Sequence, residues 1–141
     1  MLVLDTDLLT ILLRGPATER ARLLAWLDRA DDREVAVTII TFEEQMRGWL
    51  AVITKAKTFE QQSAAYARLG ELLSDFSELP VLAFDVIAAR RFGELRRKYR
   101  RHGAADLKIA SVAIVNDATL LTRNIRDFHD VDELSVDNPL A

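Results

Sequence analysis

The chain of 141 residues has the length of one ordinary domain, and its mixture of 50% hydrophobic and 29% charged residues is typical of a folded protein. It has no cysteine and only two histidines, which excludes disulfide bonds, thiolate metal sites and multi-histidine zinc sites, so a bound metal would need oxygen ligands. The net charge of −3 argues weakly against a protein that coats nucleic acid, but it does not exclude a local basic patch.

The N-terminus shows no targeting pattern. It lacks a basic region followed by a long apolar stretch and a small-residue cleavage site. No apolar run approaches the length that spans a bilayer. We therefore expect a cytoplasmic protein with one domain, residues 1–141, and no association with a membrane.

The first forty residues alternate between apolar strands and amphipathic helices. Residues 1–4 form a continuous apolar run, as in a strand buried on both faces, and the leucines of residues 6–13 recur at helical spacing. Gly15 and Pro16 break this helix, and the leucines of the segment that follows again share one stripe. The sequence EVAVTII, residues 34–40, predicts a second strand.

Residues that favour helix N-termini mark the middle of the chain. Thr41, with Glu44 three residues later, has the spacing of a capping box, and Thr58 and Asp85 are placed to cap two further helices. The apolar run LPVLAF predicts a strand between those two helices. The helix after Asp85 is expected to continue to Gly103, whose missing Cβ suits a left-handed helix end.

The last forty residues continue the alternation. The segment AADLKIASVAIVND predicts a helix, ATLLT a strand, RNIRDF a polar loop, and the residues near LSV a last short strand. Strands that alternate with helices favour right-handed βαβ units. The expected fold class is α/β, with a central, mostly parallel β-sheet of four to five strands and helices on both faces.

Acidic residues follow the predicted strands. Asp5 comes directly after the first strand, Glu44 lies just past the second, and Asp106 lies early in the helix that precedes ATLLT. Each acid alone is explained as well by capping or by the positive end of a helix. Together they would lie at the edge of a parallel sheet where ligands bind, and carboxylates brought together repel unless a cation neutralises them. Oxygen ligands of this kind favour Mg²⁺ or Mn²⁺.

Four segments of the chain share a recognisable order and spacing: MLVLDTDLL, TIITFEEQMRG, GAADLKIASVAIVNDATLLTRNIRDF and VDELSV. Together they resemble the PIN-domain ribonucleases, and more narrowly the VapC-like toxins of bacterial type II toxin–antitoxin systems, and the resemblance covers essentially the whole chain. It implies a PIN-like domain in which Asp5, Glu44 and Asp106 are catalytic residues and ligands of the metal. It also implies a further metal ligand from the loop after the fourth strand, either Asn124 or Asp127.

The chain departs from the family pattern at two positions. Asn124 stands where many PIN domains have an aspartate, and we interpret it as a weaker fourth ligand, with Asp127 as the alternative. Asp7 replaces an asparagine often found in the family, which adds an acid near the metal pocket. Whether one metal ion or two would bind stays open.

The activity that the resemblance implies is endonucleolytic hydrolysis of an RNA phosphodiester. Mg²⁺, with Mn²⁺ as a substitute, would polarise the phosphate and activate a water molecule. An arginine near the same edge could stabilise the developing negative charge. The candidates for this substrate-binding role are Arg14, Arg123 and Arg126.

The run ELRRKYRRHG is the most basic stretch of the chain. One interpretation is a track for the RNA backbone, in which Arg97 and Arg100 bind phosphates and Tyr99 offers a stacking face. The alternative is a solvated helix face whose cations interact with the helix C-terminus, and the sequence supports both equally.

The resemblance also implies partners. A VapC-like toxin would form a complex with a small VapB-like antitoxin, would itself be a homodimer, and would meet DNA only through the antitoxin. The apolar side chains needed for such contacts are expected on the early helices, and the candidates are Leu12, Leu13, Leu23, Leu27, Trp49 and Leu50.

Two other functions stay open. The sequence VLDTD imitates the strand and Asp-x-Asp of haloacid-dehalogenase-like phosphatases, with Asp5 as nucleophile and Asp7 as acid and base. Leu9 argues against this class, which has a small or β-branched residue two places after the second aspartate. The class also needs a later lysine and a paired-acid loop, which are not found in this short chain. The other alternative is a non-catalytic PIN-like binding module, in which Asn124 would reflect a lost site.

Overall fold

Parallel strands form the centre of the computed structural model, which describes residues 1–30 and 34–141. The strand order in this described part is β3-β2-β1-β4-β5, and each neighbouring pair is parallel, as the alternation of strands and helices predicted. The strands are β1 (Leu2–Leu4), β2 (Val35–Thr38), β3 (Val81–Leu82), β4 (Thr119–Leu121) and β5 (Ser135–Asp137).

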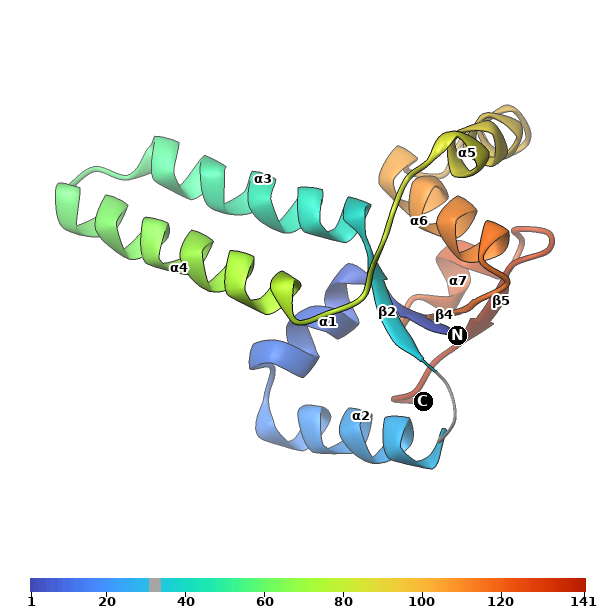
Figure 1. Cartoon of the computed structure of the whole chain (residues 1–141), viewed down its shortest axis with the longest axis horizontal. Helices are drawn as coiled ribbons and strands as arrows, with labels where there is room; N and C mark the ends of the chain where they lie inside the picture. Colours follow the sequence, from blue (N-terminus) through green and yellow to red (C-terminus); the bar gives the residue numbers. More distant parts are fainter. Residues whose placement is uncertain (31–33) are drawn as a thin grey trace.

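Helices cover both faces of this sheet (Figure 1). None of those in the described ranges is both long and apolar enough to cross a membrane. They are α1 (Thr6–Arg14), α2 (Ala17–Arg29), α3 (Ile39–Lys55), α4 (Phe59–Ser77), α5 (Val86–Lys98), α6 (Ala104–Val115) and α7 (Ile125–Phe128).

The alternation of side chains along β1 divides the core into two clusters. Leu2 and Leu4 pack with α1, α2 and α4 on one face, whereas Val3 packs with α5, α6 and α7 on the other. All three side chains are fully buried. Leu23, which was expected at the surface, is also fully buried, because α2 turns this side chain toward the first cluster. That prediction was wrong.

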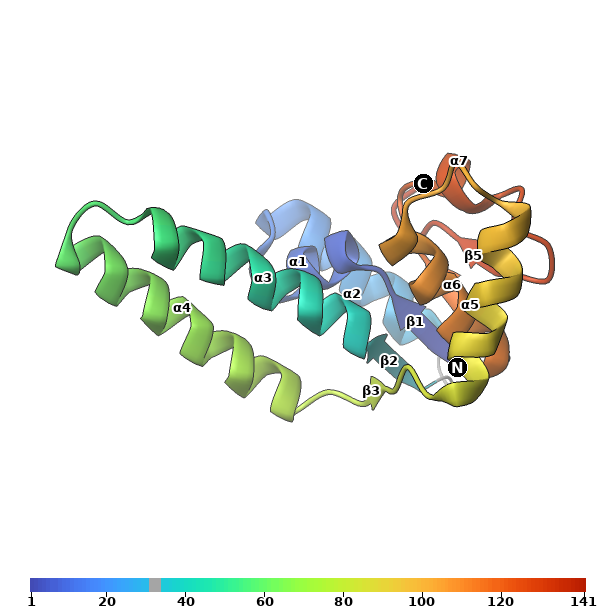
Figure 2. The same ribbon diagram turned by 90° about the horizontal axis from the view of Figure 1, so that it is seen from above.

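The helices α3 and α4 lie side by side and project away from the sheet (Figures 1 and 2). Phe42 of α3 and Phe76 of α4 hold the base of this pair with an edge-to-face contact of 5.0 Å between ring centroids. Large apolar side chains nearer the tip are exposed, among them Leu50, Phe59 and Leu73. The pair therefore presents apolar surface that the rest of the described chain does not cover.

Three of the four predicted helix caps are confirmed. The side chains of Asp5, Thr58 and Asp85 each accept a hydrogen bond from the amide three residues further on. The fourth, at Thr41, is wrong, because α3 begins at Ile39 and the hydroxyl of Thr38 accepts the amide of Thr41. The β-branched residues at 39 and 40 suggested strand, but they lie in the first helical turn.

The prediction for Gly103 is also wrong. Helix α5 ends at Lys98, five residues before Gly103, and Gly103 with φ of −62° is the N-cap of α6. Arg96, in the last turn of α5, holds the loop between the two helices, because its guanidinium donates to the carbonyl of His102 at 2.6 Å. The polar loop RNIRDF contains the short helix α7, which the sequence did not indicate.

Candidate functional site

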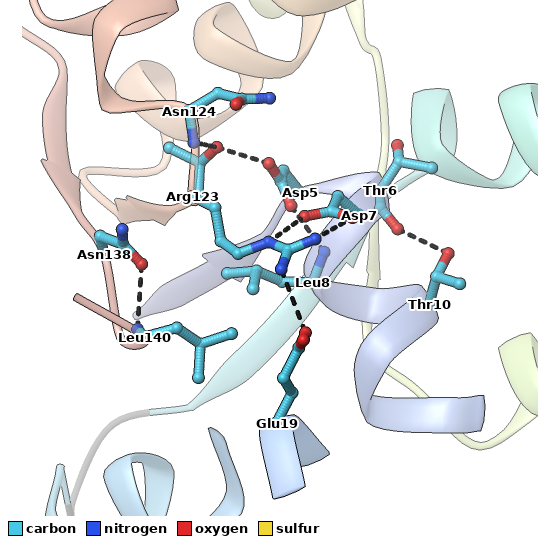
Figure 3. Close-up of polar contacts among 11 residues, drawn as sticks. Asp5, Thr6, Asp7, Leu8, Thr10, Glu19, Arg123, Asn124, Asn138 and Leu140 are labelled. Atoms are coloured by element: carbon cyan, nitrogen blue, oxygen red, sulfur yellow. Dashed lines mark hydrogen bonds and ion pairs between the residues drawn. The ribbon is translucent and has the colours of Figure 1, made fainter. Parts of the chain in front are cut away.

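Asp5 connects the first strand to the first helix and is held at both carboxylate oxygens. Its Oδ1 accepts the amide of Leu8 at 2.8 Å, and its Oδ2 accepts the hydroxyl of Thr122 at 2.5 Å (Figure 3). The residue is only 8% exposed. Burial raises the pKa of Asp5 above its ordinary value, the bonds from Thr122 and Leu8 counteract this, and the nearby Asp7 and Asp106 carboxylates raise it further.

Glu44 lies in the second turn of α3 and faces α1. Its carboxylate accepts the hydroxyl of Thr6 at 2.8 Å, and the same hydroxyl lies 3.2 Å from that of Thr41. Because α3 begins at Ile39, Glu44 is not the N3 residue of a capping box. Glu44 also lines a pocket of about 500 Å³ between α1 and α3, beside Trp49.

Asp106 lies in the first turn of α6 and is half-buried. Burial raises its pKa, and the Glu44 and Asp127 carboxylates raise it further, while His102 lowers it. Asp106 and Asp127 line one pocket of about 280 Å³ together with Arg101 and Arg126. The three acids that the sequence singled out, Asp5, Glu44 and Asp106, thus come from three elements and influence one another electrostatically.

The loop after β4 brings Asn124 to the same edge of the sheet. The backbone amide of Asn124 donates to the hydroxyl of Thr122 at 3.0 Å, so Thr122 connects Asn124 to Asp5. The sequence reasoning missed Thr122, a buried polar residue that directly follows a buried strand. That position is the signal that could have found it, since buried hydroxyls need partners.

The predicted substrate-binding arginines have different environments. Arg14 forms an ion pair with Asp75 of α4 at 2.9 Å, and Arg123 binds the Asp7 and Glu19 carboxylates. Arg126 is exposed beside Asp106 and Asp127 in their pocket. Of these three, only Arg126 has no ion pair with another described residue.

The basic run at the end of α5 combines structural and exposed cations. Lys98 pairs with Asp132, and the hydroxyl of Tyr99 accepts the amide of Asp132 at 2.9 Å while its ring packs against the core. Tyr99 is therefore a packing residue, not a free stacking face. Arg97 and Arg100 are exposed and have no ion pair within the described ranges. Arg101, which the sequence reasoning did not single out, points to the pocket that contains Asp106.

The residues at this edge suit a divalent cation by chemistry and by charge. All donors are oxygens, which Mg²⁺ and Mn²⁺ prefer, and Asp5, Glu44 and Asp106 have no ion pair with a basic residue in the described part of the chain. As the side chains stand, no three acids or histidines among residues 1–30 and 34–141 form a ready-made ligand group. The donor set is present, but it is not preassembled.

Comparison with known proteins agrees with this reading of the fold. The model of the PIN domain family matches residues 2–134. The ribonuclease VapC10 of Mycobacterium tuberculosis is 32% identical over 133 residues, which cover 91% of this chain and 86% of that protein. The ribonuclease VapC2 of Rickettsia felis is 30% identical over 113 residues, which cover 77% of each chain.

Solved structures of complexes contain chains with the same fold. One solved structure is VapBC2 from Rickettsia felis bound to a DNA fragment from the promoter of these proteins. A chain of it is 27% identical with a TM-score of 0.68, and the match covers 97% of both chains. A chain of FitAcB from Neisseria gonorrhoeae is 27% identical with a TM-score of 0.69 and covers 99% of this chain and 98% of its own length. With its parallel sheet, its acids at the carboxyl edge and these matches along nearly its whole length, the chain belongs to the PIN domain family, among relatives of the VapC type.

Proposed function

We propose that this chain is a metal-dependent endoribonuclease that acts in the cytoplasm as the toxin of a VapBC-type toxin–antitoxin pair. The observation that carries the proposal is the set of three acids, Asp5, Glu44 and Asp106, which three separate elements bring to one sheet edge without a basic partner. Membership of the PIN domain family over residues 2–134 runs against the phosphatase alternative.

The chain's own residues would prepare this edge for a metal and a phosphate. Bound Mg²⁺ or Mn²⁺ would neutralise the acids, polarise a phosphodiester and lower the pKa of a water molecule. Asp5 is already oriented by the Leu8 amide and the Thr122 hydroxyl, so one of its oxygens needs little reorganisation to become a ligand. Glu44, held by Thr6, is oriented in the same way.

Arginines on the side of α6 would guide the RNA backbone. Arg101 and Arg126 line the pocket that holds Asp106 and Asp127, so they would attract phosphates toward the acids. Arg97 and Arg100 are exposed near the end of α5 and would extend this contact along the RNA backbone. Exposed cations without carboxylate partners lose little when they bind phosphate, whereas paired ones must first break an ion pair.

A small antitoxin would cover the apolar surface of the projecting helix pair. An apolar pocket of about 330 Å³ lies between α3 and α4, lined by Phe42, Met46, Tyr66, Leu69 and Leu73 among others. Leu73 and Leu50 are more than two-fifths exposed, which suits an amphipathic segment of a partner. A VapB-like antitoxin would carry the DNA-binding part of the complex, and a second copy of this chain would complete the toxin dimer.

The decisive experiment is cleavage of a structured and an unstructured RNA by the purified, partner-free chain. It is run with Mg²⁺, with Mn²⁺ and with a chelator, beside Asp5→Asn and a control, Asp132→Asn, prepared in the same way. We expect metal-dependent cleavage that disappears in Asp5→Asn and persists in the control. Asparagine keeps the acceptor for the Leu8 amide, so the variant should fold.

Two results would count against the proposal. Equal cleavage by the wild type and Asp5→Asn would place the activity elsewhere or in a contaminant, and cleavage that is unaffected by the chelator would exclude the metal. If a panel that includes transfer, ribosomal and messenger RNA is left intact, the non-catalytic binding module becomes the better account. Light scattering at micromolar concentrations tests the dimer separately.

A further inference from the structure

Arg123 connects three elements through two carboxylates. Its Nε and Nη2 donate to Oδ2 and Oδ1 of Asp7 at 2.7 and 3.0 Å, and its Nη1 donates to Oε2 of Glu19 at 3.1 Å (Figure 3). Asp7 lies in the first turn of α1, and Glu19 lies in the first turn of α2. The loop after β4 is thus attached to the starts of two helices by one guanidinium, in the forked geometry that arginine provides.

This contact lies next to the one that holds Asp5. Thr122 donates to Asp5, and the following residue, Arg123, binds Asp7, so two consecutive loop residues hold the short segment from Asp5 to Asp7. Asn124 follows at once, with its amide on the Thr122 hydroxyl. Movement of Arg123 would therefore be transmitted to the partners of Asp5.

The charges support a contact within the protein. The hydrogen bonds to the Asp7 carboxylate raise the pKa of Arg123 above its ordinary value, burial counteracts this, and the charges of Asp7 and Glu19 raise it further, so the guanidinium is stabilised as a cation. Arg123, Asp7 and Glu19 are each about two-fifths exposed at the side chain. Partly exposed ion pairs contribute little to overall stability, so a purpose in local geometry is the better explanation for a three-part contact at this place.

We propose that Arg123 is a positioning residue, which holds the Thr122–Asn124 loop against Asp5 through Asp7 and Glu19, and that Asp7 serves as its counter-charge. The inference rests on the proposed function for the purpose of the loop, but not for the contact itself. It assigns Arg123 a role distinct from binding RNA, and it gives Asp7 a partner where the family pattern often has asparagine.

Amide hydrogen exchange followed by NMR tests this proposal without any cleavage. The reporters are the amides of Leu8, bound to Asp5, and Asn124, bound to Thr122. In Arg123→Gln we expect both amides to exchange about threefold to tenfold faster, the range expected for losing two partly exposed ion pairs. The matched control is Arg14→Gln, which removes the ion pair with Asp75 at 2.9 Å and should leave both amides unchanged.

Charge reversal adds a second criterion. The double variant Asp7→Arg with Arg123→Asp should restore slow exchange relative to each single variant, because it recreates the pair with opposite polarity. Exchange that is unchanged in Arg123→Gln, or raised equally in the Arg14→Gln control, would overturn the proposal. So would a double variant that exchanges as fast as the faster single one.

Kinetics distinguish positioning from RNA binding. If the wild type cleaves RNA, Arg123→Gln should lower kcat about tenfold or more with KM changed less than about twofold, because the loss falls on alignment. A raised KM with unchanged kcat would instead mean that Arg123 contacts RNA, and would overturn the proposal. If the wild type does not cleave any RNA, the proposed function fails, and the exchange measurement still decides the role of Arg123.

Discussion

Two groups of acids in this small protein have opposite surroundings. On the flank formed by α5 and residues 130–133, each acid pairs with a basic residue. At the carboxyl edge of the sheet, Asp5, Glu44 and Asp106 form no ion pair within the described ranges, and the hydrogen bonds to Asp5 and Glu44 come from hydroxyl and amide groups. The flank pairs are Lys98–Asp132, Arg91–Glu94 and Arg91–Glu133, both at 2.7 Å, and His102–Asp130 at 3.1 Å.

The pKa directions reflect this difference. Lys98 lowers the pKa of Asp132, while burial together with neighbouring carboxylates raises the pKa of Asp5 and of Asp106. Ion pairs between exposed side chains are common on protein surfaces and contribute little to folding stability. Neighbouring acids without a cation cost stability, so this arrangement makes the carboxyl edge the candidate functional site. Residue type alone does not distinguish the two groups, and only their partners in the folded chain separate them.

The largest expected difference between the groups is in catalysis. Asp106→Asn should lower RNA cleavage by about 100-fold or more, because one charge of the proposed metal site is lost. Asp132→Asn should leave cleavage within about twofold. The measurement is the initial rate with saturating Mg²⁺, and circular dichroism checks that both variants are folded. Equal losses in the two variants would remove the distinction between the groups.

Binding of Mg²⁺ should show the next largest difference. A cation that binds only the folded chain stabilises it by about 1.4 kcal/mol at ten times its Kd. We expect this gain for the wild type and Asp132→Asn, and a much smaller gain for Asp106→Asn. Thermal unfolding at increasing Mg²⁺ concentration, with Na⁺ at matched ionic strength as the control, measures it. A gain that is the same in all three proteins would mean that Mg²⁺ binds elsewhere.

Without metal, the effect of Asp106 on stability should depend on pH with a definite sign. Its pKa is raised in the folded chain, so the folded state holds more protons than the unfolded state, and stability falls as pH rises from about 3.9 through the folded pKa. Asp106→Asn should therefore raise the Tm by a few degrees at pH 7 and have almost no effect below about pH 4. Thermal unfolding at several pH values, in chelator, measures this difference, and a Tm difference between Asp106→Asn and the wild type that does not change with pH would contradict it.

The smallest effect should come from Asp132, with the opposite sign. Lys98 lowers the pKa of this carboxylate, so its contribution is present at neutral pH and is lost as pH falls through the folded pKa. Because Asp132 is exposed, Asp132→Asn should lower the Tm by about 1 °C or less at pH 7, and less still at 1 M salt. A salt-independent loss would show that packing, not charge, is involved.

Much of the fold was accessible from local chemistry. The caps at Asp5, Thr58 and Asp85 were predicted because a side-chain acceptor just before an amphipathic segment can accept a backbone amide of the first helical turn. The start of α3 was not, because Ile39 and Ile40 have the propensity of a strand and Thr41 has the spacing of a cap. The hydroxyl of Thr38 and the packing of Ile40 against the core decide the boundary.

The candidate site shows the same division. That Asp5, Glu44 and Asp106 belong together could be predicted, because parallel strands bring their carboxyl ends to one edge. Their partners could not, since Thr6, Thr122 and Glu19 are ordinary polar residues until the chain is folded. Contacts such as Thr122 with Asp5 join residues 117 positions apart, and no local pattern records them.

The sequence by itself determined the alternation of strands and helices, because periodicity and residue type act over short distances. It also indicated the family, through the order and spacing of four segments, and the three acids of the candidate site. The tertiary structure alone decided which of the candidate arginines form ion pairs within the described part of the chain. Arg14, Arg123 and Arg126 were equivalent as residues near one edge, but folding places Asp75 beside the first and Asp7 and Glu19 beside the second. The strength of an ion pair depends on distance and burial, and both are set only when remote segments pack together.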